Sequence, residues 1–477
     1  MMMMRALSFV VVFLAAQIAG CALAPPPQHS DVVNEALPKG TSIPPGWKSD
    51  ASRAPVADDW LKSLDDPMLD AIVAEAIANN LDLRQAADGV TIAQQSVVVV
   101  GAQLLPQIGA VLGGRTTRDT DHNSNSNTTI AFASVAWELD VWGKLRAQRA
   151  AVEAGYEATA LDYAYARQSL AATVARTWYL AIETRQLLDL AEQAVGIYRQ
   201  LFNLVAARRA AGKDSDLDVA DIRAKVETAL SAVEAERESY GEVRRALEVL
   251  LGRYPAAEIE VATTYPLLPT PPATSLPAAL LERRPDLVGA EREVLAAFRQ
   301  EEAAKLALLP DFSFSFAGGR LGDPLLSTLR LNPWLATAAI GASIPIYTGG
   351  ALQAQVKIAT AHQSQAVAHY GNVVLTAFRE VENSLANDQL LAKQLPLDKS
   401  AVDARIEAVR IATVQYKAGR RDLLWVSNLQ TDELAAEADL LKLLGLQRVN
   451  RIRLYLALGG SFDPTPSTTL QRTDYVP

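Results

Sequence analysis

Cysteine, histidine and methionine are scarce in this chain of 477 residues, which contains one, four and five of them respectively. The single cysteine, Cys21, permits no intrachain disulfide. His362 and His369 lie two turns apart on one predicted helix, about 10 Å along its axis, which is too far to share a metal ion. The sequence contains no nucleophile elbow and no metalloprotease motif. We therefore expect no cofactor, no metal site and no enzymatic activity.

Basic residues are too few to balance the acidic ones. The chain has 45 Lys and Arg against 54 Asp and Glu, a formal net charge of −9. This balance argues against a nucleic-acid-binding protein. The acidic excess would favour cations in any passage whose wall it lined, although an ordinary soluble acidic surface explains the excess equally well.

Apolar runs long enough to form a spanning helix are missing after the first 20 residues. Residues 1–20 contain a basic residue and then an apolar run from Ala6 to Ala16, the pattern of a secretory signal. Ile18 to Cys21 resembles the bacterial lipobox, which implies cleavage before Cys21 and lipid attachment to its thiol. Because Ala22 is not aspartate, the resemblance implies delivery to the outer membrane. The alternative is an ordinary signal followed by an incidental cysteine.

Proline is missing from Gly143 to Gly252, and this stretch returns 207 positions later in the chain. Apolar residues recur three or four apart from Tyr163 to Val205, close to a heptad period. We therefore predict a duplicated helical hairpin. Pro396, in the second copy, has no counterpart in the first, so a kink or a break is expected there. The repeated landmarks are Gly143, Gly212 and Gly252, which correspond to Gly350, Gly419 and Gly459.

The first arm of each hairpin is unusually long. If helical throughout, Gly143 to Gly212 would measure roughly 100 Å at about 1.5 Å per residue. Such an arm needs partner helices along its whole length. Its apolar stripe therefore predicts packing surface and not a ligand site.

The apolar period changes to two in four segments, which predicts two β-hairpins. In the first half, every odd residue from Ala131 to Val141 is apolar, and Gln107–Thr117 alternates more weakly. Arg118–Thr128 between them predicts a polar, exposed loop. In the second half, Phe312–Phe316 and Trp334–Ile346 alternate in the same way.

Strands of about ten residues with one apolar face suit an outer-membrane wall, where every backbone group pairs inside a closed barrel. Four strands cannot close a barrel, since the smallest such barrels have about eight. If these strands span the membrane, the chain must oligomerise. The expected fold class is mainly α with membrane β, built from two units that each contain a strand hairpin and a long helical hairpin.

The boundaries of these units follow from caps and prolines. Asp66 and Pro67 predict the start of a helical segment that continues to about Leu104, with no proline before Pro106. The expected divisions are a lipoprotein signal peptide (1–20), a lipidated N-terminal tether or wrapping arm (21–65), a first repeat (66–252), a proline-rich linker (253–277), a second repeat (278–459) and a C-terminal tail without pattern (460–477).

Four segments in series carry a family resemblance: Trp60–Ala86, Trp137–Arg146, Leu276–Glu291 and Ile344–Val356. Each is weak alone. In this order, and over nearly the whole chain after the signal, they resemble the TolC-type outer-membrane efflux channels, specifically the NodT-like lipoprotein branch of tripartite RND efflux systems.

The resemblance implies a homotrimer in which twelve strands form one β-barrel and twelve helices continue as a periplasmic α-helical barrel. It also implies three kinds of partner: a periplasmic adaptor, an inner-membrane RND transporter that supplies the energy, and outer-membrane lipid. The implied function is a passive exit duct for small molecules such as drugs.

The turns of the two long hairpins are the candidate functional site. A glycine between two helices permits a tight reversal, and the resemblance implies that these tips dock the adaptor and constrict the pore. Ordinary packing between helices explains Leu217 and Leu424 equally well. The expected adaptor contacts are Gly212, Ser215, Leu217, Val219, Gly419, Asp422 and Leu423, and the expected gate residues are Arg208, Asp218, Tyr416, Leu424 and Asn428.

One gate position departs from the family pattern. Relatives commonly carry an aspartate where this chain has Asn428, which gives them a ring of carboxylates in the trimer. A neutral ring loses the like-charge repulsion and the pH-dependent closure that carboxylates would provide. Asp422 or Asp432 would be the substitutes.

Two other functions remain open at this point. The same duct could serve a type I protein-secretion system, although the lipobox favours efflux. A non-conducting structural coiled-coil lipoprotein is the alternative from another class, and the alternating strands and duplicated hairpins argue against it.

Overall fold

A computed structural model describes residues 24–49, 56, 58–119, 124–323, 330 and 333–463. The predicted lipid attachment site, Cys21, lies outside these residues, as does most of the C-terminal tail. The elements are α2 (His29–Ala36), η1 (Lys62–Leu64), α3 (Pro67–Asn79), α4 (Leu81–Gly101), η2 (Ala102–Leu104), β1 (Gln107–Asp119), β2 (Ser124–Leu139), α5 (Lys144–Ala210), α6 (Asp216–Leu250), α7 (Pro277–Arg283), α8 (Pro285–Leu306), β3 (Asp311–Gly322), β4 (Trp334–Ser343), α10 (Ala351–Lys417) and α11 (Leu423–Ala457).

The described residues form two compact units. The sheet unit contains the described residues up to Thr41 together with Asp88–Asp162 and Asp286–Val373. The tip unit contains Ser42–Ala87, Tyr163–Pro285 and the described residues from Val374 onward. Each unit draws on both sequence repeats, so the compact units do not coincide with the repeats.

The helical hairpins follow the predicted duplication closely. The long arms α5 and α10 contain 67 residues each, and the return arms α6 and α11 contain 35 each. Every landmark glycine has a positive φ angle, which glycine adopts easily because it has no Cβ to clash in this region. These angles agree between the copies: 87° and 85° at Gly143 and Gly350, 72° and 71° at Gly212 and Gly419, and 73° and 68° at Gly252 and Gly459.

Of the kink or break predicted at Pro396, the break is wrong, since α10 continues through this residue. A proline removes one helical hydrogen bond and crowds the carbonyl four residues earlier, which costs about 3 kcal/mol or more inside a helix. Here Pro396 is exposed, and so is Ala392, whose carbonyl loses its partner. Water can reach that carbonyl, and the helix on either side remains intact.

The first predicted helix is divided in two. Asp66 caps α3 as expected, accepting a hydrogen bond from Leu69 N at 3.0 Å. The predicted helical segment does reach Leu104, but it is divided, because α3 ends at Asn79 and α4 begins at Leu81. Asn80 lies between the two helices and stabilises the break with its side chain. Its Oδ1 accepts a hydrogen bond from Leu83 N at 3.0 Å, and its Nδ2 donates one to Leu250 O at 3.0 Å.

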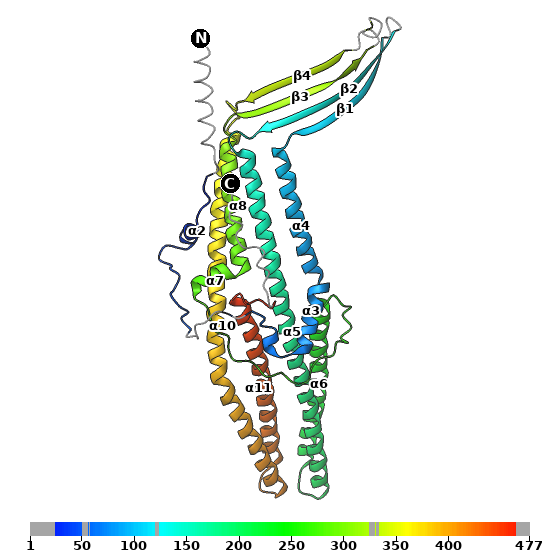
Figure 1. The fold of residues 1–477 in the computed structure, drawn as a ribbon. Coiled ribbons are helices and arrows are strands. Elements are labelled where there is room, and N and C mark those ends of the chain that lie inside the picture. The colour runs from blue at the N-terminus through cyan, green and yellow to red at the C-terminus, as the bar shows by residue number, and fades with distance from the viewer. Residues whose placement is uncertain are drawn as a thin grey trace. The chain divides into compact units, whose positions relative to one another are not determined.

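The four strands of the sheet unit lie side by side in the order β1-β2-β3-β4, all antiparallel (Figure 1). The pairing of β2 with β3, for example Trp137 with Phe314, joins the two repeats. Among the described helices, none is long and apolar enough to cross a membrane.

The predicted loop at Arg118–Thr128 is largely strand. β1 extends to Asp119 and β2 begins at Ser124, so that Arg118 pairs with Asn125. Polarity correctly indicated the exposure of described residues such as Arg118 and Asn125, but it does not determine backbone conformation. Pairing between the strands satisfies the backbone groups of these polar residues. In the second hairpin β4 ends at Ser343, three residues before the predicted limit.

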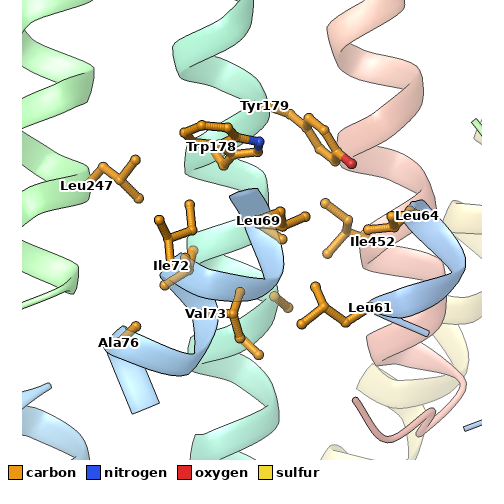
Figure 2. Close-up of a cluster of buried hydrophobic side chains, with 14 of the residues drawn as sticks. Leu61, Leu64, Leu69, Ile72, Val73, Ala76, Trp178, Tyr179, Leu247 and Ile452 are labelled. Carbon is orange, nitrogen blue, oxygen red and sulfur yellow. The ribbon is translucent and has the colours of Figure 1, made fainter. Parts of the chain in front are cut away.

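The main core of the tip unit surrounds Trp178 of α5. Figure 2 shows Trp178 beside Leu69 and Ile72 of α3, and Tyr179 and Val73 belong to the same cluster. Trp178 is fully buried, and its Nε1 donates to Asp66 Oδ2 at 2.9 Å. The same carboxylate therefore caps α3 and satisfies the only polar atom of the Trp178 side chain.

The described part of the N-terminal segment contacts helices of the sheet unit and the linker of the tip unit. In the sheet unit, His29 Nδ1 lies 2.9 Å from Glu291 Oε2, and α2 approaches α10 so closely that a Cβ at Gly371 would clash with the Ala36 carbonyl. In the tip unit, Trp47 Nε1 donates to Ser275 O at 2.8 Å. The short helix α2 was not predicted.

Glu183 on α5 supports a pH-dependent prediction. Burial raises the pKa of its carboxyl from 4.5 to about 7, against partial opposition from Lys442. The unfolded chain therefore ionises before the folded one, and stability falls as pH rises between these values. We expect Glu183→Gln to unfold at a higher temperature than the wild type at about pH 8 and at the same temperature at about pH 4. A thermal melt at both pH values checks this, and an equal difference at both would contradict it.

Candidate channel tip

The turn between α5 and α6 is held by local hydrogen bonds. Lys213 N donates to Arg208 O at 2.9 Å as the chain reverses at Gly212. Ser215 caps α6, since its Oγ accepts from Asp218 N at 3.1 Å, and the Asp218 carboxylate accepts from Ser215 N at 2.8 Å. Asp218, a predicted gate residue, therefore forms part of a capping box.

The turn between α10 and α11 repeats this design. Arg420 N donates to Gln415 O at 2.9 Å around Gly419, and Asp422 caps α11 by accepting from Trp425 N at 3.0 Å. Asp422 stands 207 positions after Ser215, so the two caps are equivalent in the duplication. Asp422 thus has a structural role, and Asp432 lies 3.3 Å from Arg405.

Three side chains link the two turns of the protomer. Arg208 Nε donates to Asp214 Oδ2 at 2.9 Å, and the Tyr416 hydroxyl donates to the same oxygen. The Arg208 guanidinium also lies 4.4 Å from the centre of the Tyr416 ring. We call Arg208, Asp214 and Tyr416 the tip cluster. It joins the α5–α6 turn to the end of α10.

The protonation states of the tip cluster favour these contacts. The hydrogen bond to Asp214 raises the pKa of the Arg208 guanidinium further above neutrality. Burial, followed by the hydrogen bond to Asp214, raises the pKa of the Tyr416 hydroxyl. Arginine therefore stays charged and tyrosine stays a donor throughout the physiological range.

An apolar cluster lies behind these polar contacts and draws on all four tip helices. Its buried members include Val205, Ile222, Leu423 and Val426. Leu423 was predicted to contact an adaptor, but its side chain is only 2% exposed. Its contribution to any adaptor contact would be indirect, through the packing of α11.

The exposed face of the tip is partly apolar. Leu217 is 77% exposed and Leu424 58% exposed, so neither is covered within the protomer. Ordinary packing inside one protomer therefore does not explain them. The remaining predicted residues Gly212, Gly419 and Asn428 are exposed, and Val219 is half-buried.

Sequence reasoning missed three tip residues. Asp214 gave no signal, because its partner Tyr416 is 202 residues away in the chain. Trp425 and Arg421 were not predicted either. The Arg421 guanidinium stacks 4.0 Å from the centre of the half-exposed Trp425 ring. An aromatic residue three positions after a helix cap, at a turn predicted to be exposed, was the available signal.

Comparisons with known proteins agree with this architecture. A family model described as outer membrane efflux protein matches residues 72–253 and 276–460, well over half of the chain. The chain belongs to this family. One relative is the pyoverdine export outer membrane protein OpmQ of Pseudomonas putida. It is 28% identical to this chain over 449 residues, which cover 90% of this chain and 94% of that protein.

Another relative and a solved structure extend the likeness. The cation efflux system protein CusC of Escherichia coli is 26% identical over 455 residues, 94% of this chain and 97% of that protein. The open state of the Neisseria gonorrhoeae MtrE outer membrane channel has a TM-score of 0.79 at 23% identity, covering 93% of this chain and 100% of that one.

The predicted TolC-type channel family, the fold class and the principal function are confirmed. The chain is a TolC-type channel, mainly α with membrane β, and it serves an efflux pump in the outer membrane. The family is one of channels, not of enzymes.

Proposed function

We propose that three copies of this chain form a passive exit duct for small molecules, lipidated at Cys21, within a tripartite pump. Its partners are a periplasmic adaptor, which docks at the tips, and an inner-membrane RND transporter, which supplies the energy. Outer-membrane lipid surrounds the strands, whose twelve copies close one β-barrel.

The observation that carries this proposal is the four-stranded sheet with β1 and β4 at its edges. Within the described residues, each of these strands pairs on one side only. A membrane-exposed edge leaves backbone groups unsatisfied, so the edges of a spanning sheet must meet others. Three copies supply twelve strands, above the minimum of about eight for such barrels.

Bilayer recording and mass measurement test this proposal together. The purified protein should have the mass of a trimer in detergent, and variants with a disrupted tip cluster should conduct in a planar bilayer. A monomeric protein, or trimers that never conduct, would contradict the exit duct and favour a structural lipoprotein.

The tip supports both adaptor docking and gating in this proposal. Exposed apolar residues such as Leu217 and Leu424 are suited to burial against a partner. Arg208, Asp214 and Tyr416 tie the two turns together on the same end of the protomer. Asn428 is exposed and neutral, so a ring of these residues would add no charge repulsion to the constriction.

The names of the relatives support the proposal that the substrates are small molecules. Their names include pyoverdine export, toluene efflux and cation efflux. The same duct in a type I protein-secretion system is the alternative, and none of these names supports it. Efflux of small dyes from cells that carry the chain and its cognate pump would distinguish the two.

A separate prediction concerns the lipid anchor. We expect Cys21→Ser to abolish incorporation of labelled palmitate, because only a thiol forms the thioether link and the chain has no other cysteine. Metabolic labelling and gel autoradiography check this. Palmitate incorporation equal to that of the wild type would show that the lipobox interpretation is wrong.

A further inference from the structure

A cavity in the tip unit lies between the proline-rich linker and the helices α10 and α11. Its volume is about 370 Å³, within the usual range for sites that bind small organic molecules. Most of its wall is apolar, and the polar side chains are few. It is lined by Leu267, Leu268, Pro269, Pro271, Asp388, Ala392, Leu444, Gln447, Arg448 and Arg451.

The charges in this wall do not balance. Arg451 is 2% exposed and pairs with Asp388, with Nη2 and Oδ1 at 2.9 Å. Arg448 is 8% exposed, and none of the described carboxylates lies within ion-pair distance of it. The cavity therefore carries one uncompensated positive charge.

The contacts of Arg448 do not neutralise it. Its two terminal nitrogens donate to Leu444 O at 2.9 Å and Pro266 O at 3.1 Å, and its guanidinium lies 4.0 Å from the centre of the Tyr265 ring. Its Nε is buried and has no acceptor among the described residues. Burial lowers the pKa of this guanidinium, as expected for a charge without a counter-ion. A buried and unpaired charge is costly, and an anion would relieve that cost.

Arg448 helps to hold the linker through its bond to Pro266 O, but this contact does not account for its unpaired charge. Arg451 donates to Pro269 O, and its equivalent in the first repeat, Arg244, donates to Ile259 O at 2.8 Å. Both repeats thus anchor the linker through the same arginine position. The equivalent of Arg448 is Gly241, so the first repeat anchors its part of the linker without a second arginine.

We propose that this cavity binds a small organic anion, with its carboxylate at Arg448 and its apolar body against Leu267, Leu268 and Leu444. A carboxylate matches the single uncompensated charge and the planar guanidinium donors. The apolar wall distinguishes such a ligand from inorganic phosphate. None of the residues that line this cavity belongs to the tip cluster.

Fluorine NMR of the full-length protein in nanodiscs tests the proposal, with para-trifluoromethylbenzoate as the probe. We expect the benzoate to bind saturably. The neutral para-trifluoromethylbenzamide and inorganic phosphate should each compete with it at an affinity at least about tenfold lower. Arg448→Gln should weaken benzoate binding about tenfold and remove the preference over the amide. Arg244→Gln is the matched control, because it loosens the linker without altering the cavity, and it should bind as the wild type does.

A second variant keeps the test valid if Arg448→Gln folds poorly. Ala392→Phe fills the cavity from an exposed position of α10 and should abolish binding of the probe. Three results would overturn the proposal: no saturable binding of the benzoate, equal affinity for benzoate and benzamide, or unchanged affinity in both Arg448→Gln and Ala392→Phe.

Discussion

Trp178→Ala is expected to lower the free energy of unfolding by about 3–5 kcal/mol, the usual cost of removing a large aromatic side chain from a core. Trp178 is fully buried at the centre of the cluster that joins α3, α5, α6 and α11. The change leaves a cavity that these helices cannot easily fill. It also removes the donor to Asp66, the residue that caps α3.

Chemical denaturation followed by circular dichroism measures this effect. Trp178→Phe separates its two causes, because phenylalanine keeps most of the buried ring but cannot donate to Asp66. We expect Trp178→Phe to lower the free energy of unfolding by less than Trp178→Ala does. The loss that remains would come from the Asp66 carboxylate, which no longer has its donor. A Trp178→Ala protein as stable as the wild type would show that this cluster does not hold the hairpins together.

Features that depend on local sequence were predictable. Apolar periodicity without proline predicted α5, and the duplication of this stretch predicted α10. The glycines at 212 and 419 predicted the turns, because left-handed backbone angles strongly favour glycine. The cap at Asp66 was equally local, since a carboxylate bonds the backbone three residues later.

Features that depend on tertiary contacts were not predictable. The apolar pattern continues through Asn80, and the helix breaks there because its side chain reaches both Leu83 and the distant Leu250. Polarity misled the prediction at Arg118–Thr128, where pairing between strands decides the conformation. Arg448 gave no signal as a ligand-binding residue, because the cavity exists only once the linker has folded over α11.

The candidate site was predictable in part for the same reason. The resemblance placed Arg208 and Tyr416 at the tip, and the structure brings them into one cluster. It could not supply Asp214, the carboxylate that both contact. The position of Asp214 in the duplication is occupied by Arg421 in the other turn, so the repeat itself gave no indication of an acidic residue.

Asp214→Asn is expected to increase single-channel conductance severalfold. The Asp214 side chain is only 7% exposed, and it accepts hydrogen bonds from Arg208 and Tyr416 on the two turns. Asparagine keeps its size but removes the charge, so Arg208 is left with a much weaker partner. If the tip cluster holds the turns in a closed arrangement, its loss shifts the population toward an open one.

Asp216→Asn is the matched control for this measurement. Asp216 belongs to the same turn and pairs with Arg209 at 2.7 Å, but its side chain is 82% exposed. Exposed ion pairs contribute about 0–1 kcal/mol to the stability of a fold. This change should therefore leave the conductance close to that of the wild type. Tyr416→Phe removes one of the two hydrogen bonds to Asp214 and should give an intermediate increase. If Asp214→Asn and Asp216→Asn conduct equally, the tip cluster does not constrict the pore and the gate lies elsewhere.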